Sequence, residues 1–145
     1  MKLYHYTHTK ALKQILKDGK IKIATASAPR KTKPIAWVSA HEHFEPSALK
    51  GYVTYLEQRT LTFKEQFEGF GCVRIEILPH SNLHTWAKLY HSANYEDGTY
   101  RSLTDAGIDA GANPDDWYGS LKPIPAKYFI KVEMFDGNKW VEYKN

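Results

Sequence analysis

The first twenty residues bring together side chains that can hold an anionic or sugar-bearing ligand. His5 and Thr7 lie in a short apolar stretch, directly before a segment whose apolar residues recur four apart. A histidine ring at such a position can form a hydrogen bond with a ligand, and the backbone amides at a helix start favour a phosphate. One alternative stays open, namely that His5 and Thr7 only satisfy backbone groups at a strand-to-helix turn.

Local signals place this histidine between a strand and a helix. Thr7 or Thr9 can cap the helix start, and Gly19 can supply the left-handed residue at its end. Between them, the apolar residues at positions 11, 12, 15 and 16 form one face that a helix would bury. The pattern therefore predicts a strand that delivers His5 to the mouth of a helix.

The rest of the chain alternates between strand and helix signals. Residues 94–120 are rich in Gly, Asp, Asn and Ser, which predicts a long loop with a functional or closing role. The chain should end in a hairpin, with strands over 128–134 and 140–143. The other expected elements are strands over 20–24, 35–39 and 72–78, a short helix from Glu45-Pro46, a helix opened by a capping box at Thr62, and a helix within 83–92.

Length and composition indicate a single domain over residues 1–145. A chain of this length can bury a core without disulfides or a structural metal. Because strands outnumber helices, we expect an α+β fold with a mostly antiparallel, split β-sheet and short flanking helices. The single cysteine, the short apolar runs and a start without a signal-peptide core predict a cytoplasmic protein that does not bind a membrane.

Positive charge is concentrated in the first third of the chain. Residues 1–50 carry ten Lys and Arg against three acids, a net of +7, whereas the remainder has a net of −3. Arg30, Lys31 and Lys33 lie in a Ser/Pro/Lys segment that should be an exposed loop. A positive loop near a ligand site suits a nucleotide or a nucleic acid, although a merely solvated surface loop is the alternative.

Other chemically active residues have weaker patterns. His41-Glu42-His43 and the pair His80 and His84 each lack the three protein ligands of a zinc enzyme, so we expect no metal. Asp residues between 105 and 116 miss the spacing of a calcium loop. Cys72 begins a strand with no helix start evident beside it, which favours a buried, inert thiol over a nucleophile.

Three short motifs, in order along the chain, resemble the ADP-ribosyltransferase-like superfamily. The first is Leu3-Tyr4-His5-Tyr6-Thr7 with its following helix, and the second is Ala36-Trp37-Val38-Ser39, an aromatic residue followed by serine on a strand. The third is Trp-Tyr-Gly-Ser-Leu-Lys-Pro-Ile-Pro at 117–125, ahead of a strand. The likeness extends to small bacterial or phage members and to RNA 2′-phosphotransferase-like and rifampin ADP-ribosyltransferase-like proteins.

The resemblance implies a split β-sheet that clamps NAD. His5 would hydrogen-bond the nicotinamide ribose with support from Thr7, and Trp37 would stack on the nicotinamide ring with Ser39 beside it. The glycosidic bond of NAD breaks through an oxocarbenium-like cation, so positioning and charge stabilisation carry this chemistry. The further cofactor-binding residues that the resemblance implies are Tyr6, Tyr118 and Ser120.

The chain departs from the family where a catalytic carboxylate is expected. The family places this acid just before an Ile-Pro and a strand, but here the stretch reads Ser-Leu-Lys at 120–122. An acid from another loop, Asp116 or another such as Glu45, can reach the site, and we take Asp116 as catalytic together with His5 and Trp37. Two alternatives stay open, a reaction without such an acid, as in tRNA 2′-phosphotransferases, or binding of NAD or ADP-ribose without catalysis.

The function predicted from the sequence is mono-ADP-ribosyl transfer from NAD to a macromolecule, as in a bacterial or phage effector or toxin. The acceptor would be a nucleic acid or a host protein, and the basic loop with Arg30, Lys31 and Lys33 favours the nucleic acid. The alternative is a non-catalytic module that binds RNA or DNA through phosphate contacts and aromatic stacking.

Overall fold

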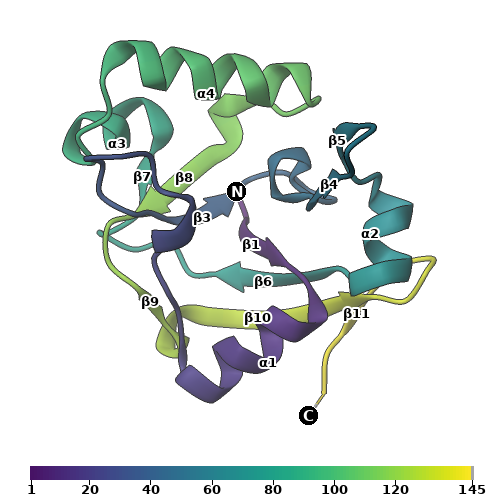
Figure 1. Cartoon of the computed structure of the whole chain (residues 1–145). Coiled ribbons are helices and arrows are strands. Elements are labelled where there is room, and N and C mark those ends of the chain that lie inside the picture. Colours follow the sequence, from purple (N-terminus) through teal and green to yellow (C-terminus); the bar gives the residue numbers. More distant parts are fainter. Residues whose placement is uncertain (145) are drawn as a thin grey trace.

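The computed structural model describes residues 1–144 as an α+β fold built on an antiparallel sheet, which confirms the predicted fold class (Figure 1). The large sheet has the strand order β11-β10-β6-β1-β3-β8-β7, and the pairs β2-β9 and β4-β5 form small separate sheets. The strands are β1 Leu3–Thr7, β2 Lys20–Ile21, β3 Ala36–Ser39, β4 Gly51–Val53, β5 Gln58–Thr60, β6 Val73–Ile77, β7 His84–Thr85, β8 Trp117–Ser120, β9 Ile124–Pro125, β10 Phe129–Phe135 and β11 Trp140–Glu142. The helices are α1 Thr9–Asp18, α2 Phe63–Phe70, α3 Trp86–Ser92 and α4 Asp97–Asp109, with 3-10 turns at Thr25–Ser27, Pro46–Ala48, Pro114–Asp116 and Ala126–Tyr128.

Strand β1 lies in the middle of the large sheet. It pairs with β6 along its whole length, beginning with Leu3 opposite Ile77. Because successive side chains of a strand point to opposite faces of the sheet, β1 contributes to two separate parts of the core. Leu3 packs into a cluster with residues of α1, whereas Tyr4 and Tyr6 belong to a second cluster beside α2. On its other edge β1 pairs with β3 through a single position, which makes this the shortest ladder of the large sheet.

Helix α1 follows β1 as predicted, but its cap is a different residue. The cap is His8, whose Nδ1 accepts from the amide of Ala11 at 3.4 Å, and not Thr7 or Thr9. Gly19 ends the helix in the left-handed conformation, with a φ of 71°. The threonine prediction was wrong because histidine is an unusual cap, so its ring nitrogen gives no clear signal in the sequence.

Local signals also located most of the remaining elements. The capping box at Thr62 and Glu65 opens α2, and the hairpin β10–β11 closes the sheet at its edge. Two expected elements are shorter than predicted, since the strand after α1 is only β2 and the helix at Glu45-Pro46 is a 3-10 turn. The helix expected within 83–92 is α3. No helix within residues 1–144 has the length and apolarity needed to cross a membrane.

The long loop predicted over 94–120 was wrong, because this segment contains α4, a 3-10 turn and β8. Helix α4 has two glycines and no side-chain cap at its start, which are poor local signals for a helix. Its stability comes from packing. The indole Nε1 of Trp86 donates to Thr104 Oγ1 at 3.0 Å, and Gly107 lies directly against the ring of Trp117.

A glycine substitution tests this packing. A Cβ on Gly107 would lie 2.3 Å from Trp117, whereas a Cβ on Gly98, in the same helix, would meet nothing within 4 Å. Thermal unfolding of Gly107→Ala should show a loss of about 1–3 kcal/mol from overpacking. Gly98→Ala should be neutral or stabilising by up to about 1 kcal/mol, since it reduces the entropy of the unfolded chain. Equal stabilities of the two variants would contradict close docking of α4 on Trp117.

Candidate functional site

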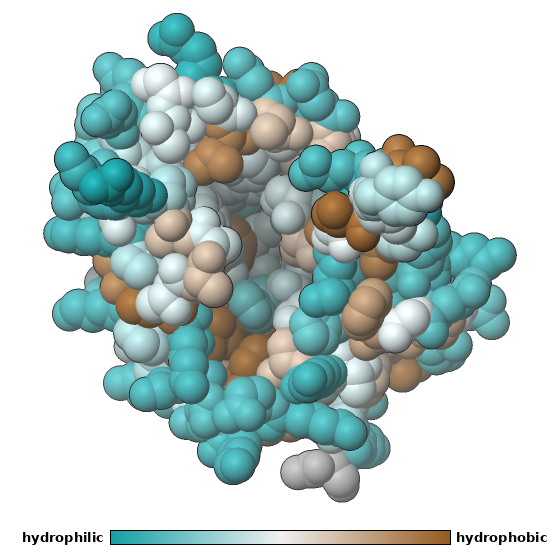
Figure 2. Space-filling view, viewed as in Figure 1, coloured by the Kyte–Doolittle hydropathy of each residue, from teal (hydrophilic) through white to brown (hydrophobic). Residues whose placement is uncertain are grey.

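A cavity of about 550 Å³ opens beside the junction of β1 and β3. Figure 2 shows it as the hollow in the middle of the visible face, with apolar and polar residues both reaching its rim. Its wall is formed by β1, β3, the loop 24–29, the segment 45–49 and one face of α4, and by aromatic residues from α3 and β8. A cavity of this size can hold a drug-sized or nucleotide-sized ligand.

His5 lies in this wall and has a fixed tautomer. Its Nδ1 lies 2.8 Å from the carbonyl oxygen of Trp37, so Nδ1 carries the hydrogen and donates it. Burial lowers the pKa of His5, which keeps the ring neutral at pH 7. The Nε2 atom is therefore the hydrogen-bond acceptor of a histidine that lines the cavity.

Glu45 supplies a buried carboxylate in the same wall, with 5% of its surface exposed. It accepts three hydrogen bonds, from Ser39 Oγ at 2.8 Å, from the Ser47 amide at 3.0 Å and from Ser47 Oγ at 2.7 Å. These bonds hold both of its oxygens in place, and Ser39 links the carboxylate to β3. A carboxylate so arranged can stabilise a positive charge or accept a proton from a bound group.

Three tryptophans form the aromatic side of the cavity. The ring of Trp37 lies 5.3 Å from that of Trp86 and 6.4 Å from that of Trp117. Tyr95 and Tyr4 add further aromatic surface to the lining. The indole Nε1 of Trp117 is buried and has no hydrogen-bond partner among the described residues. Such a wall can stack on a flat ring and favours a positively charged one.

The residues predicted from the sequence divide into two groups. His5, Tyr6, Trp37 and Ser39 all line the cavity, whereas Thr7, Tyr118 and Ser120 are not among its lining residues. The Tyr6 hydroxyl donates to the carbonyl of His41, and burial raises the pKa of Tyr6, so this hydroxyl is committed within the protein. Tyr118 contacts Met1, and Ser120 Oγ donates to the Lys122 carbonyl at 2.7 Å.

Asp116 lies next to the site without lining the cavity. Its carbonyl accepts from the Ala40 amide at 2.9 Å, just beyond the end of β3. Burial and the nearby charge of Glu45 raise the pKa of the Asp116 side chain. Of the two acids considered from the sequence, Glu45 is therefore the one whose carboxylate is in the cavity wall.

The basic loop lies at the rim of the cavity. Ser27, Ala28 and Pro29 belong to the lining, and the exposed residues Arg30, Lys31 and Lys33 follow at once. The loop is held in place by the Lys33 amide, which donates to the Ala93 carbonyl at 2.8 Å, and by Thr32 Oγ1, which donates to the Pro29 carbonyl at 2.6 Å. None of the three cations forms an ion pair within residues 1–144, so they are available to an anionic ligand.

The other chemically active residues lie outside this site. Within the described part of the chain, no group of three or more His, Cys, Asp or Glu side chains could hold a metal ion. His80 instead stacks on Tyr128, with ring centroids 3.8 Å apart. Cys72 is buried in the cluster beside α2, and burial raises the pKa of its thiol to about 12.

Sequence reasoning missed Trp86, Tyr95 and Trp117 as site residues. Trp117 had one usable signal, since it opens the third motif, and in the structure it pairs with Ser39. Trp86 and Tyr95 come from segments with no visible link to the first motif. The chain matches no protein-family model, no curated protein and no solved structure in comparisons with each. The resemblance to ADP-ribosyltransferase-like proteins therefore stays a prediction that rests on the motif residues.

Replacing the buried carboxylate by an amide tests this part of the site. In Glu45→Gln, an amide NH₂ would face one of the three hydrogen-bond donors, which should cost about 1–3 kcal/mol of stability. Loss of the negative charge should also lower the pKa of Asp116 towards its ordinary value, measurable by NMR titration of the carboxyl carbons. The exposed Glu142→Gln is the control and should change neither quantity. An unaltered Asp116 titration in Glu45→Gln would contradict the position given to this carboxylate.

Proposed function

We propose that this protein is an ADP-ribosyltransferase that uses NAD and modifies a macromolecule. The observation that carries the proposal is one cavity that combines aromatic walls, a neutral histidine acceptor and a buried carboxylate. NAD would supply the ADP-ribosyl group, since its bond to nicotinamide breaks towards an oxocarbenium-like cation. The residues of the cavity match the needs of this chemistry in three separate ways.

The first match is with the nicotinamide ring, which is flat and positively charged in NAD. Trp37, Trp86 and Trp117 line the cavity together, with the ring of Trp37 5.3 Å from that of Trp86 and 6.4 Å from that of Trp117. A cation over an indole ring gains about 0.5–2 kcal/mol, with more when water is excluded. The negative charge of Glu45 in the same wall favours the same cation.

The second match is with the ribose. The Nε2 atom of neutral His5 can accept a hydrogen bond from a ribose hydroxyl, and the bond from Nδ1 to Trp37 fixes the direction of the ring. The third match is with the developing charge. Glu45 can stabilise the cationic sugar and then accept the proton of the attacking group, while its own bonds to Ser39 and Ser47 hold it in position.

The basic loop extends this site towards the rest of the dinucleotide. Arg30, Lys31 and Lys33 follow directly on lining residues and are unpaired within the described chain. Two phosphates connect the two halves of NAD, and lysine and arginine are the usual partners of such groups. We assign this loop to the diphosphate of NAD in preference to a polyanionic acceptor.

Labelled NAD tests the proposed activity. With the label on the adenine side, the native protein should release nicotinamide and pass label to macromolecules of a cell lysate. Glu45→Gln should lower turnover about 100-fold or more while NAD still binds, because general-base contributions are of this order. Glu142→Gln is the matched control and should keep full activity. Binding without nicotinamide release would instead identify a non-catalytic module, and absence of NAD binding would overturn the proposal.

Binding measurements test the ring and ribose contacts separately from catalysis. By calorimetry, His5→Ala and Trp37→Ala should each weaken NAD binding roughly tenfold, since a hydrogen bond or a stacked ring contributes on the order of 1 kcal/mol or more. Trp140→Ala should leave the affinity unchanged, because Trp140 packs on Arg74 and Phe135 outside the cavity lining.

The same assay has a pH signature. The lowered pKa of His5 means that native affinity should be flat from pH 8 to pH 6.5 and fall only at lower pH, where protonation turns Nε2 into a donor. His5→Ala should lack this fall. A native affinity that falls on raising the pH from 6.5 to 8, or a fall at low pH that His5→Ala retains, would contradict the role given to Nε2.

A further inference from the structure

The hairpin formed by β4 and β5 stands beside the mouth of the cavity with its whole length exposed. Leu49 and Thr60, at the base of the hairpin, line the cavity, and every residue from 51 to 60 is exposed. In Figure 1 the hairpin projects on the side of the molecule opposite α3, and Figure 2 shows apolar atoms on the same projection. A macromolecule that presents a group to the cavity would therefore lie next to this hairpin.

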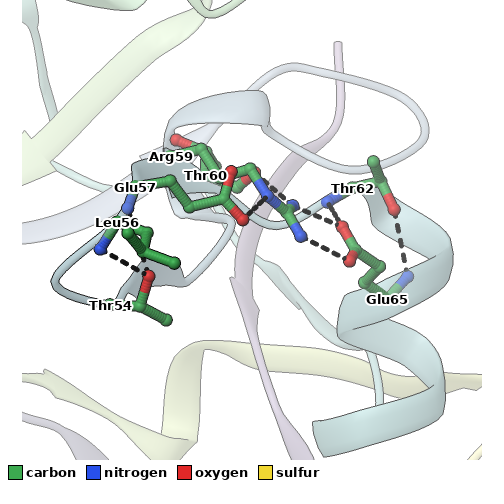
Figure 3. A network of polar contacts seen from close by, with 7 residues as sticks. All are labelled: Thr54, Leu56, Glu57, Arg59, Thr60, Thr62 and Glu65. Carbon is green, nitrogen blue, oxygen red and sulfur yellow. Dashed lines mark hydrogen bonds and ion pairs between the residues drawn. The ribbon is translucent and has the colours of Figure 1, made fainter.

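The turn of the hairpin has a fixed conformation. The Thr54 amide donates to the Glu57 carbonyl at 2.8 Å, and Thr54 Oγ1 accepts from the amides of Leu56 at 3.2 Å and Glu57 at 3.1 Å. One threonine thus satisfies two backbone donors at the tip (Figure 3). The residues of the tip are presented in one arrangement, which lowers the entropy lost when a partner binds.

A second set of contacts ties the hairpin to helix α2. The two terminal nitrogens of Arg59 donate to the two carboxylate oxygens of Glu65 at 2.7 and 2.8 Å, and Glu65 also completes the capping box with Thr62 (Figure 3). On its other side, the Arg59 guanidinium lies 4.7 Å from the ring centroid of Tyr52. This bidentate pair fixes the direction in which the hairpin leaves the body of the protein.

The tip itself is apolar and carries no free charge. Val53, Tyr55 and Leu56 are 70%, 96% and 79% exposed. Residues 51–60 contain one acid, Glu57, and one base, Arg59, and the guanidinium of Arg59 is already shared between Glu57 and Glu65. A nucleic acid would need free cations here, and residues 51–60 offer none besides the paired Arg59, so the exposed ring of Tyr55 has no phosphate contact beside it. An apolar patch on a protein is the surface that this tip complements.

We infer that the β4–β5 hairpin is the docking element for a protein acceptor, whose apolar surface patch covers Val53, Tyr55 and Leu56. The inference rests on the proposed function, because it names the class of macromolecule that receives the ADP-ribosyl group. The hairpin holds the acceptor at the rim of the cavity, and the cavity residues carry out the transfer. The tip residues Val53, Tyr55 and Leu56 then contribute to transfer alone, because only the base of the hairpin, at Thr60, borders the cavity proposed for NAD.

The experiment compares transfer with nicotinamide release in the full chain. Tyr55→Ser combined with Leu56→Ser should lower transfer of adenine-labelled ADP-ribose to lysate protein at least tenfold, with nicotinamide release and NAD affinity unchanged. Ile130→Ser, at a strand position that is 53% exposed and outside the cavity lining, is the control and should alter none of these quantities. The label should be removed by protease and resist nuclease.

Several results would overturn the inference. The first is that nuclease removes the label, and the second is that the double variant transfers ADP-ribose as well as the native protein. The third is that the native chain is a dimer and the double variant a monomer. If the native protein releases no nicotinamide, the proposed function fails, and the hairpin is then judged by site-specific photo-crosslinking. A crosslinker at position 55 should capture more lysate protein than one at position 130, and Leu56→Ser should abolish this excess. Equal capture at both positions would overturn the docking role.

Discussion

The hydrogen bond from His5 Nδ1 to the Trp37 carbonyl is the contact on which the site depends. It joins β1 to β3 beside their single paired position, Tyr4 opposite Ser39, where the ladder of the large sheet is shortest. A buried backbone carbonyl needs a donor, and the imidazole of His5 supplies one to Trp37. The same bond makes Nε2 the acceptor nitrogen of a residue that lines the cavity, so one contact joins the two strands and sets the tautomer.

The buried carboxylate follows from the same junction. Ser39, which pairs with β1, donates to Glu45, and the 3-10 turn at Pro46–Ala48 lets Ser47 donate twice more to the same side chain. Burying a carboxylate without a cationic partner is unfavourable, and three hydrogen bonds offset only part of that cost. A cation in the cavity would supply the rest, so the arrangement favours a positively charged ligand over a neutral one.

The sequence predicted the parts of this site that depend on neighbours along the chain. The position of His5 before a helix, the end of α1 at Gly19 and the capping box of α2 all follow from residues within one or two turns. Helix α4 was not predicted, because its stability comes from contact with Trp117 and Trp86, not from its own residues. The choice of Glu45 over Asp116 depends on where the segment 45–49 lies against β3, which no local pattern encodes.

Helix α4 has a consequence for the strength of ligand binding. It forms one wall of the cavity, yet it has two glycines, no side-chain cap at its start and exposed residues along most of its length. Any change that weakens its contacts with Trp86 and Trp117 would lower the fraction of molecules in which α4 is docked, and only the docked position encloses a ligand. The measured affinity equals the intrinsic affinity multiplied by the docked fraction, so changes on the outer surface of α4 alter affinity without touching the ligand.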